Sequence, residues 1–217
     1  YKYYPKLENA VNDAIELTKF VKEMLNFQTF KLINEGATKY NIEHMLKNIL
    51  FQSTDTNDLL VISFHGHGET LNINNTNYGF IVPFKSSNDK TPAELISMND
   101  FSNWTQYLKP NHILILLDCC FSGFSAIRGK RESFGIYTKE TIYNILNRKS
   151  RIIINAGTET QHTSDGGWGN NSIFTGSILS YPNYENQLGS VLNLYNYIFE
   201  NITKHVGNQT PTMGKMV

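Results

Sequence analysis

The clearest pattern along the chain is a series of short apolar runs that alternate with longer segments of helical spacing. Continuous apolar runs rich in Ile, Leu and Val are typical of strands buried on both faces of a parallel sheet. Apolar residues three and four positions apart predict amphipathic helices. The predicted strands are 59–64, 112–117 and 151–156, with shorter candidates at 30–33 and, after a polar Asn-rich loop, at 79–84. The predicted helices are 7–25, 38–50, 98–108, 139–147, 172–179 and 191–206, with a mobile loop at 124–137.

This alternation predicts an α/β fold in which parallel β-α units pack helices on both faces of one sheet. The length of 217 residues suits a single domain, residues 1–217, with a substantial core. The chain opens almost directly with a helix, whereas a doubly wound unit offers a strand first. We therefore expect the sheet to need a strand from residues that precede Lys6.

Composition excludes several classes of partner. Nineteen basic and nineteen acidic residues give a formal net charge of zero, so nothing drives binding to nucleic acid or to an anionic membrane. No apolar run approaches the length of a membrane span, and no secretory signal opens the chain. The two cysteines are adjacent, which excludes a disulfide framework and favours a reducing compartment such as the cytoplasm.

Two polar motifs follow predicted buried strands and carry the candidate chemistry. Phe64-His65-Gly66-His67-Gly68 follows one strand, and Asp118-Cys119-Cys120-Phe121-Ser122-Gly123 follows the next. Open α/β sheets bind ligands at the carboxyl ends of their strands. A thiol beside a base becomes a strong nucleophile. The motifs therefore predict a cysteine hydrolase with a Cys–His dyad, and the backbone N–H groups of Gly68 and Cys120 are candidate donors to the oxyanion.

Each motif also has a plainer explanation. Gly-His-Gly is a common loop, and a cysteine after a buried strand is often an inert core residue. A metal site built from His65, His67, Cys119 and Cys120 is the rival chemistry, but adjacent cysteines of an extended chain point to opposite faces. Structural zinc sites instead use cysteine pairs separated by two to four residues. We therefore expect no metal and no cofactor.

Taken together, the motifs resemble the caspase and metacaspase clan of cysteine peptidases, nearest its bacterial metacaspase-like (orthocaspase) branch. The two polar motifs stand where metacaspases carry Ser-Gly-His-Gly and Asp-x-Cys-His-Ser-Gly, and a histidine roughly 50 residues before the cysteine is typical of caspases. Weaker similarities extend over nearly the whole chain: Leu7-x-x-Ala10-x-Asn12-Asp13-Ala14, Ala37-Thr38-x-x-Asn41-Ile42, Ala156-Gly157-Thr158-x-x-Gln161, Ser172-Ile173-Phe174-Thr175 and Gln209-Thr210-Pro211.

The resemblance implies a caspase-like three-layer α-β-α sandwich with a mostly parallel central sheet. It divides the domain into a large-subunit-like part, 1–130, and a small-subunit-like part, 131–217. It implies that Cys120 is the nucleophile, His67 the base, and Cys119 the variable position. Metacaspases bind a basic side chain with two acidic residues, which correspond here to Asp13 and Asp118. Cleavage of a protein or peptide after Arg or Lys is therefore implied. We also expect residues 1–217 to be a fragment of a longer chain.

Two departures from the family pattern keep alternatives open. His65 replaces a small serine near the specificity pocket, so its ring belongs to the expected substrate-binding residues and alters the pocket. Residues 72–77 are rich in Asn where many metacaspases carry calcium-binding Asp, which makes calcium dependence doubtful. The alternatives are an inactive caspase-like interaction module, a caspase-fold protease with non-basic specificity, and a related cysteine hydrolase or transpeptidase. An upstream activating or inhibitory segment is the remaining expected partner.

Overall fold

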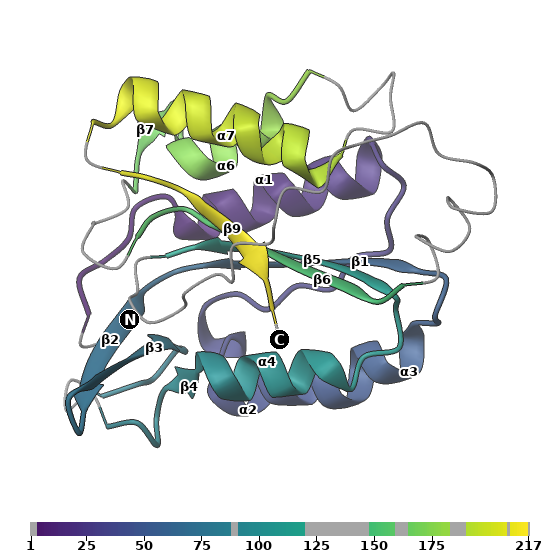
Figure 1. Ribbon diagram of the computed structural model, residues 1–217, viewed down its shortest axis with the longest axis vertical. Coiled ribbons are helices and arrows are strands. Elements are labelled where there is room, and N and C mark those ends of the chain that lie inside the picture. Colours follow the sequence, from purple (N-terminus) through teal and green to yellow (C-terminus); the bar gives the residue numbers. More distant parts are fainter. Residues whose placement is uncertain are drawn as a thin grey trace.

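The protein folds as a central sheet between two layers of helices, as a computed structural model shows (Figure 1). The structure describes residues 4–87, 91–119, 148–158, 165–182, 190–207 and 209–216. The predicted loop 124–137 and the predicted helix 139–147 lie outside these ranges, as does Cys120. The three layers and the mostly parallel sheet confirm the predicted fold class.

The central sheet has the strand order β1-β5-β6-β9. Its first three strands are parallel and coincide with the three predicted runs, whereas the fourth is antiparallel and was not predicted. β9 has only four residues, Thr-Met-Gly-Lys, and follows a Pro, so its sequence contains no continuous apolar run. The strands are β1 (Leu59–His65), β5 (His112–Asp118), β6 (Ser150–Asn155) and β9 (Thr212–Lys215).

One face of the sheet is covered by three helices: α1 (Ala10–Glu23), α6 (Ile173–Leu179) and α7 (Val191–His205). Their apolar sides meet the sheet residues in one buried cluster that includes Leu17, Leu116, Ile154, Phe174 and Ile198. Burial of this apolar surface holds the layer in place. Figure 1 shows these helices together above the sheet.

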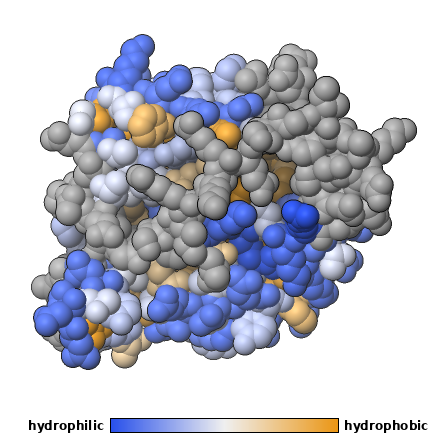
Figure 2. Space-filling view, viewed as in Figure 1, coloured by the Kyte–Doolittle hydropathy of each residue, from blue (hydrophilic) through white to orange (hydrophobic). Residues whose placement is uncertain are grey.

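The other face is covered by α2 (Lys39–His44), which continues through a π-helical turn (Met45–Leu50) into α3 (Phe51–Ser53), and by α4 (Met98–Gln106). Thr38 and Ser97 accept backbone hydrogen bonds at the starts of α2 and α4, as capping hydroxyls do. The core on this side includes Leu46, Phe101, Ile113, Ile115 and Leu117. The outer surface of this layer is mostly hydrophilic in Figure 2, as expected for amphipathic helices.

A small antiparallel sheet follows β1, formed by β2 (Gly68–Ile73), β3 (Thr76–Ile81) and β4 (Ile96–Ser97). The Asn-rich segment that was predicted as a loop before the strand at 79–84 is therefore mostly strand, because β2 and β3 form a hairpin that leaves only Asn74 and Asn75 in the turn. Asn74 and Asn75 occupy its turn with φ of 50° and 62°, a left-handed conformation that Asn tolerates. A second hairpin joins β7 (Gly167–Trp168) to β8 (Asn171–Ser172).

The sheet has an unpaired edge at β1. Among the described residues, β1 pairs with β5 alone, and no backbone hydrogen bond joins residues 28–32 to another described residue. The predicted strand at 30–33 is therefore wrong as a member of the sheet. A cavity of about 750 Å³ separates this segment from β1, so the two backbones have no partner within reach.

No helix in the described ranges combines the length and the apolarity that crossing a membrane requires.

Candidate active site

Pairing of β1 with β5 brings the two polar motifs to the same edge of the sheet. The parallel register sets His65 opposite Asp118. The pairing continues one residue further, because the Gly66 amide donates to the Asp118 carbonyl at 3.3 Å. Cys119 follows as a buried residue, 1% exposed, and Cys120 lies outside the described residues. The sequence places His67 two residues after His65, and Cys120 two residues after Asp118.

The His67 ring is oriented by the N-terminal segment. Its Nε2 lies 2.7 Å from the Pro5 carbonyl oxygen, and its ring centroid is 5.3 Å from that of Tyr4. A carbonyl oxygen can only accept a hydrogen bond, so Nε2 carries a proton in this contact. In the neutral imidazole this assigns the basic lone pair to Nδ1. Sequence reasoning missed Pro5, because a backbone carbonyl from a distant segment leaves no motif.

Gly68 stands at the beginning of β2, directly after His67. It is paired with Ile81, and the neighbouring His67 carbonyl accepts from the Val82 amide at 3.0 Å. These bonds fix the backbone on the carboxyl side of the histidine. The oxyanion role of Gly68 and Cys120 stays a prediction.

The two predicted acidic residues meet beneath this edge in a cluster that we call the pocket cluster: Asp13, His65, Asp118, Ser172 and Thr175. The Asp13 carboxylate accepts from the Ser172 amide at 3.1 and 3.3 Å. Asp118 Oδ2 accepts from the hydroxyls of Ser172 at 2.5 Å and Thr175 at 3.1 Å. Asp13, Asp118, Ser172 and Thr175 are all buried residues, so the two carboxylates are largely removed from water.

Burial and charge strongly perturb Asp13. The pKa of Asp13 is raised from 3.8 to about 7, first because burial removes the carboxyl group from water and second because the charge of Asp118 is close, while His65 and the Ser172 hydrogen bonds oppose the rise. Two carboxylates this close compete for one proton. The cluster therefore favours a positively charged group placed against both of them.

His65 already lies within the pocket cluster. Its side chain is 2% exposed, and its Nδ1 is 3.5 Å from Asp118 Oδ2 and 3.2 Å from Thr175 Oγ1. One ligand atom from each of Asp13, His65 and Asp118 lies within 4.8 Å of the others, a spacing that could hold a metal ion. The space that the cluster borders measures about 30 Å³, room for little more than a water molecule.

Ser172 and Thr175 belong to a weak family similarity in the sequence but had no predicted role at the site, and Asp165 was not predicted. Ser172 is the N-cap of α6 and accepts from the Thr175 amide at 3.0 Å, so its local pattern is that of an ordinary helix cap. The Asp165 carboxylate accepts from the Glu8 and Asn9 amides and so fixes the segment that leads into α1. These contacts span more than 150 residues of sequence, which no local pattern can reveal.

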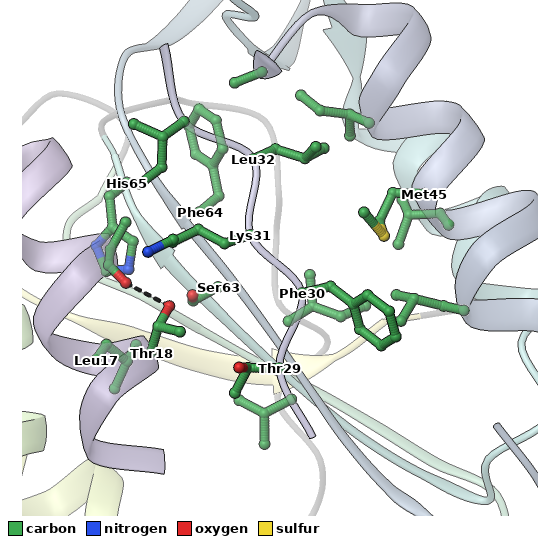
Figure 3. Close-up of a pocket in the computed structure, with 18 of the residues that line it drawn as sticks. Leu17, Thr18, Thr29, Phe30, Lys31, Leu32, Met45, Ser63, Phe64 and His65 are labelled. Atoms are coloured by element: carbon green, nitrogen blue, oxygen red, sulfur yellow. Dashed lines mark hydrogen bonds between the residues drawn. The ribbon is translucent and has the colours of Figure 1, made fainter. Parts of the chain in front are cut away.

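Figure 3 shows the large cavity beside β1, which we call the strand slot. Phe30 and Leu32 point toward the α2 side, where Met45 lies, whereas Thr29 and Lys31 point toward the α1 side, where Thr18 lies. Side chains that alternate between two faces are typical of an extended strand. His65 lines both the strand slot and the small space of the pocket cluster.

Comparison with known proteins agrees with this geometry. A crystal structure of a Geobacter sulfurreducens protein matches with a TM-score of 0.69 and 15% sequence identity, over 97% of this chain and 84% of that one, which shows a shared fold. No curated protein matches the sequence. The caspase domain matches residues 1–217. The chain therefore belongs to the caspase-domain family of cysteine peptidases.

Proposed function

We propose that this protein is a cysteine endopeptidase in which Cys120 and His67 form the catalytic dyad. The observation that carries the proposal is the β1–β5 register. It sets His65 against Asp118, so each catalytic residue follows a paired position by two residues. The Pro5 carbonyl supports the same assignment, because it holds the proton on Nε2 and so assigns the lone pair to Nδ1 of His67.

In the proposed reaction, His67 takes the thiol proton as the Cys120 sulfur attacks the scissile carbonyl carbon. The tetrahedral oxyanion accepts hydrogen bonds from the Gly68 and Cys120 amides. When the C–N bond breaks, His67 gives its proton to the leaving amine and a thioester remains on Cys120. Water then attacks the thioester with His67 as base, which releases the acid and restores the thiol.

The two adjacent cysteines allow a matched test. Replacing Cys120→Ala should lower kcat/KM by at least about a thousandfold, because the nucleophile is lost. Replacing Cys119→Ser should keep much of the activity, with some loss of stability because Cys119 is 1% exposed. The reverse pattern would overturn the assignment. Absence of turnover on any peptide by the unmodified protein would favour the inactive interaction module instead.

We also propose that cleavage follows Arg or Lys, as in the metacaspase branch. The support is the meeting of Asp13 and Asp118 at one buried place, joined through Ser172. A guanidinium or ammonium group would form charge-assisted hydrogen bonds there, each worth roughly 1.5–3 kcal/mol. An apolar side chain would leave both carboxylates without a cation.

Four peptides that differ only in the residue before the scissile bond test this specificity. Arg and Lys peptides should be cleaved faster than Leu and Asp peptides at neutral pH. Replacing Asp118→Asn should weaken cleavage of the Arg and Lys peptides selectively. Faster turnover of Leu or Asp would refute the basic pocket and leave the dyad standing, and an equal loss on all four peptides would make Asp118 a structural residue.

The proposal includes a strand from upstream of Tyr1 that fills the strand slot. The slot borders β1 along its whole length, from Leu59 to His65. Among the described residues, the outer edge of β1 and the backbone of residues 28–32 have no strand partner. Tyr4 and Pro5 lie against His67, at the carboxyl end of β1. Residues entering the slot from upstream would therefore run parallel to β1, and α1 would form the crossover to residues 27–33.

Amide hydrogen exchange tests this part of the proposal. The 217-residue chain should be compared with a chain extended upstream by about ten encoded residues, enough to span β1 at roughly 3.3 Å per residue. The β1 amides should become strongly protected in the extended chain, while those of β6 change little. Equal protection of β1 in both chains would mean that the slot is not filled from upstream.

A further inference from the structure

The pocket cluster contains its own nitrogen donor in the place where a substrate cation would bind. Thr175 Oγ1 has a single proton, which it donates to Asp118 Oδ2 at 3.1 Å. Its contact of 3.2 Å with His65 Nδ1 therefore has the ring nitrogen as donor. The His65 ring thus presents an N–H to the carboxylate side of the cluster, as a guanidinium would.

The small volume of the pocket cluster also indicates that His65 occupies the place of a substrate cation. The free volume bordered by Asp13, His65 and Asp118 is about 30 Å³, which holds about one water molecule and not a guanidinium. The carboxylates are fixed by Ser172, the N-cap residue of α6, and by Thr175 of α6, whereas His65 has the largest of the three side chains that border the space. Entry of an arginine side chain therefore requires the imidazole to move.

The ring has both the freedom and the room to move. Among the described residues, His65 Nε2 has no hydrogen-bond partner, so Nδ1 alone anchors the ring. His65 also lines the end of the strand slot, whose volume is about 750 Å³. In the 217-residue chain, where no upstream strand fills the slot, the side chain can rotate toward the slot and vacate the space between the two carboxylates.

We propose that His65 is a built-in competitor for the basic side chain of the substrate and thereby sets the selectivity of the pocket. The inference rests on the proposed basic pocket. A substrate arginine binds after it displaces the imidazole from Asp118, and the contacts of Thr175 and Asp118 pass from His65 to the guanidinium. Removal of the ring leaves the two carboxylates without an internal partner and increases the affinity for guanidinium groups.

Binding of agmatine, a small free guanidinium compound, tests the proposal without any need for turnover. Calorimetry in the presence of a chelator should compare the unmodified protein with His65→Ser, which restores a small side chain. The variant should bind agmatine at least about tenfold more tightly, because no internal donor competes for Asp118. His44→Ser, on α2 at the opposite face of the sheet, is the matched control and should bind as the unmodified protein does.

A second variant keeps the proposal testable if His65→Ser does not fold. His65→Gln keeps an amide donor of moderate size and should give an intermediate affinity. Thermal unfolding of both variants identifies the one to be interpreted. Equal or weaker agmatine binding by the folded variant would overturn the inference, and the absence of binding to every variant would overturn it together with the basic pocket.

Kinetics then separate this inference from the dyad itself. With an Arg peptide, His65→Ser should lower KM at least about tenfold and change kcat little, while a Leu peptide should show no such gain. Equal changes on both peptides would mean that His65 acts on folding or on His67 and not as a competitor. Loss of all cleavage in Cys120→Ala with unchanged agmatine binding would support the dyad and the pocket independently.

Discussion

Strands β1 and β5 have the same length, are similarly apolar and lie side by side in parallel, yet their surroundings differ sharply. β5 pairs on both edges, and most of its residues are buried. Within the part of the chain that the structure describes, β1 pairs on one edge, and none of its residues is fully buried. An apolar run therefore predicts that a strand forms, but its burial depends on which neighbours the fold supplies.

The carboxyl ends of the same two strands also differ in their surroundings. β5 ends in Asp118, whose carboxylate accepts from two hydroxyl groups, that of Ser172 at the N-cap of α6 and that of Thr175 within α6. β1 ends in His65, whose Nε2 has no hydrogen-bond partner among the described residues and whose side chain lines the strand slot. A fixed carboxylate beside a movable imidazole is the arrangement on which the proposed specificity depends.

The largest expected effect is on the free energy of unfolding, when an apolar side chain is removed from each of the two strands. Ile62 of β1 lies opposite Ile115 of β5 in the register, and both belong to the same apolar layer. Replacing Ile115→Ala should lower the free energy of unfolding by about 4 kcal/mol, because the side chain is fully buried, whereas Ile62→Ala should cost about 1 kcal/mol. Urea unfolding measures both values.

The difference between the costs of Ile115→Ala and Ile62→Ala should shrink when the upstream strand fills the strand slot. In the upstream-extended chain, Ile62→Ala should approach the cost of Ile115→Ala, because the new strand would bury Ile62. Equal costs in the 217-residue chain itself would show that β1 is already as well packed as β5.

The next effect concerns Asp13, whose pKa is raised by burial and by Asp118 at the end of β5 and lowered by His65 at the end of β1. Its folded pKa of about 7 lies above the unfolded value of 3.8, so the folded state retains a proton that the unfolded state loses. The contribution of Asp13 to stability is complete below pH 3.8 and is lost as the pH rises to about 7. Each pH unit in that interval costs up to about 1.4 kcal/mol.

Replacing Asp13→Asn should remove much of this pH dependence and leave the protein more stable at pH 8, by about 2 kcal/mol. Unfolding midpoints measured in urea across the pH range provide the comparison. Asp55→Asn, at an exposed position between α3 and β1, should leave the pH profile unchanged. A pH profile that is the same in the unmodified protein and in Asp13→Asn would contradict the raised pKa of Asp13.

A smaller effect should separate the hydroxyl that supports Asp118 from an ordinary helix cap. Ser172 caps α6 and also donates to the buried Asp118, whereas Ser190 caps α7 through a bond of 3.2 Å at an exposed position. Ser172→Ala should cost about 2 kcal/mol and Ser190→Ala about 1 kcal/mol in unfolding free energy. If the two costs are equal, the bond to Asp118 contributes nothing to stability.

The smallest expected effect is that of a chelator. The Asn-rich hairpin tip of β2 and β3 offers neutral oxygens in place of carboxylates, so we expect peptidase activity to need no calcium. Dialysis against a strong chelator should leave kcat/KM unchanged. Loss of activity that calcium restores would contradict this expectation, and loss that zinc alone restores would point to a metal held by Asp13, His65 and Asp118.

Much of the fold was predictable because its signals are local. The runs that became β1, β5 and β6 are continuously apolar, and the hydroxyls of Thr38 and Ser97 stand directly before the helices that they cap. Short antiparallel strands such as β9 carry no such signal, since their pairing depends on distant partners. The candidate dyad residues could be named from two motifs, whereas their roles stay predictions.

By itself, the sequence determined that parallel strands would end in a histidine motif and a cysteine motif, because apolar periodicity and the residues that follow each run are local properties. The tertiary structure alone decided that Asp13, His65 and Asp118 meet, that Ser172 and Thr175 fix one carboxylate, and that Pro5 orients His67. It also decided that β1 borders a slot. These contacts join residues far apart in the chain, and their free energies depend on burial and distance, which exist only once the layers have packed.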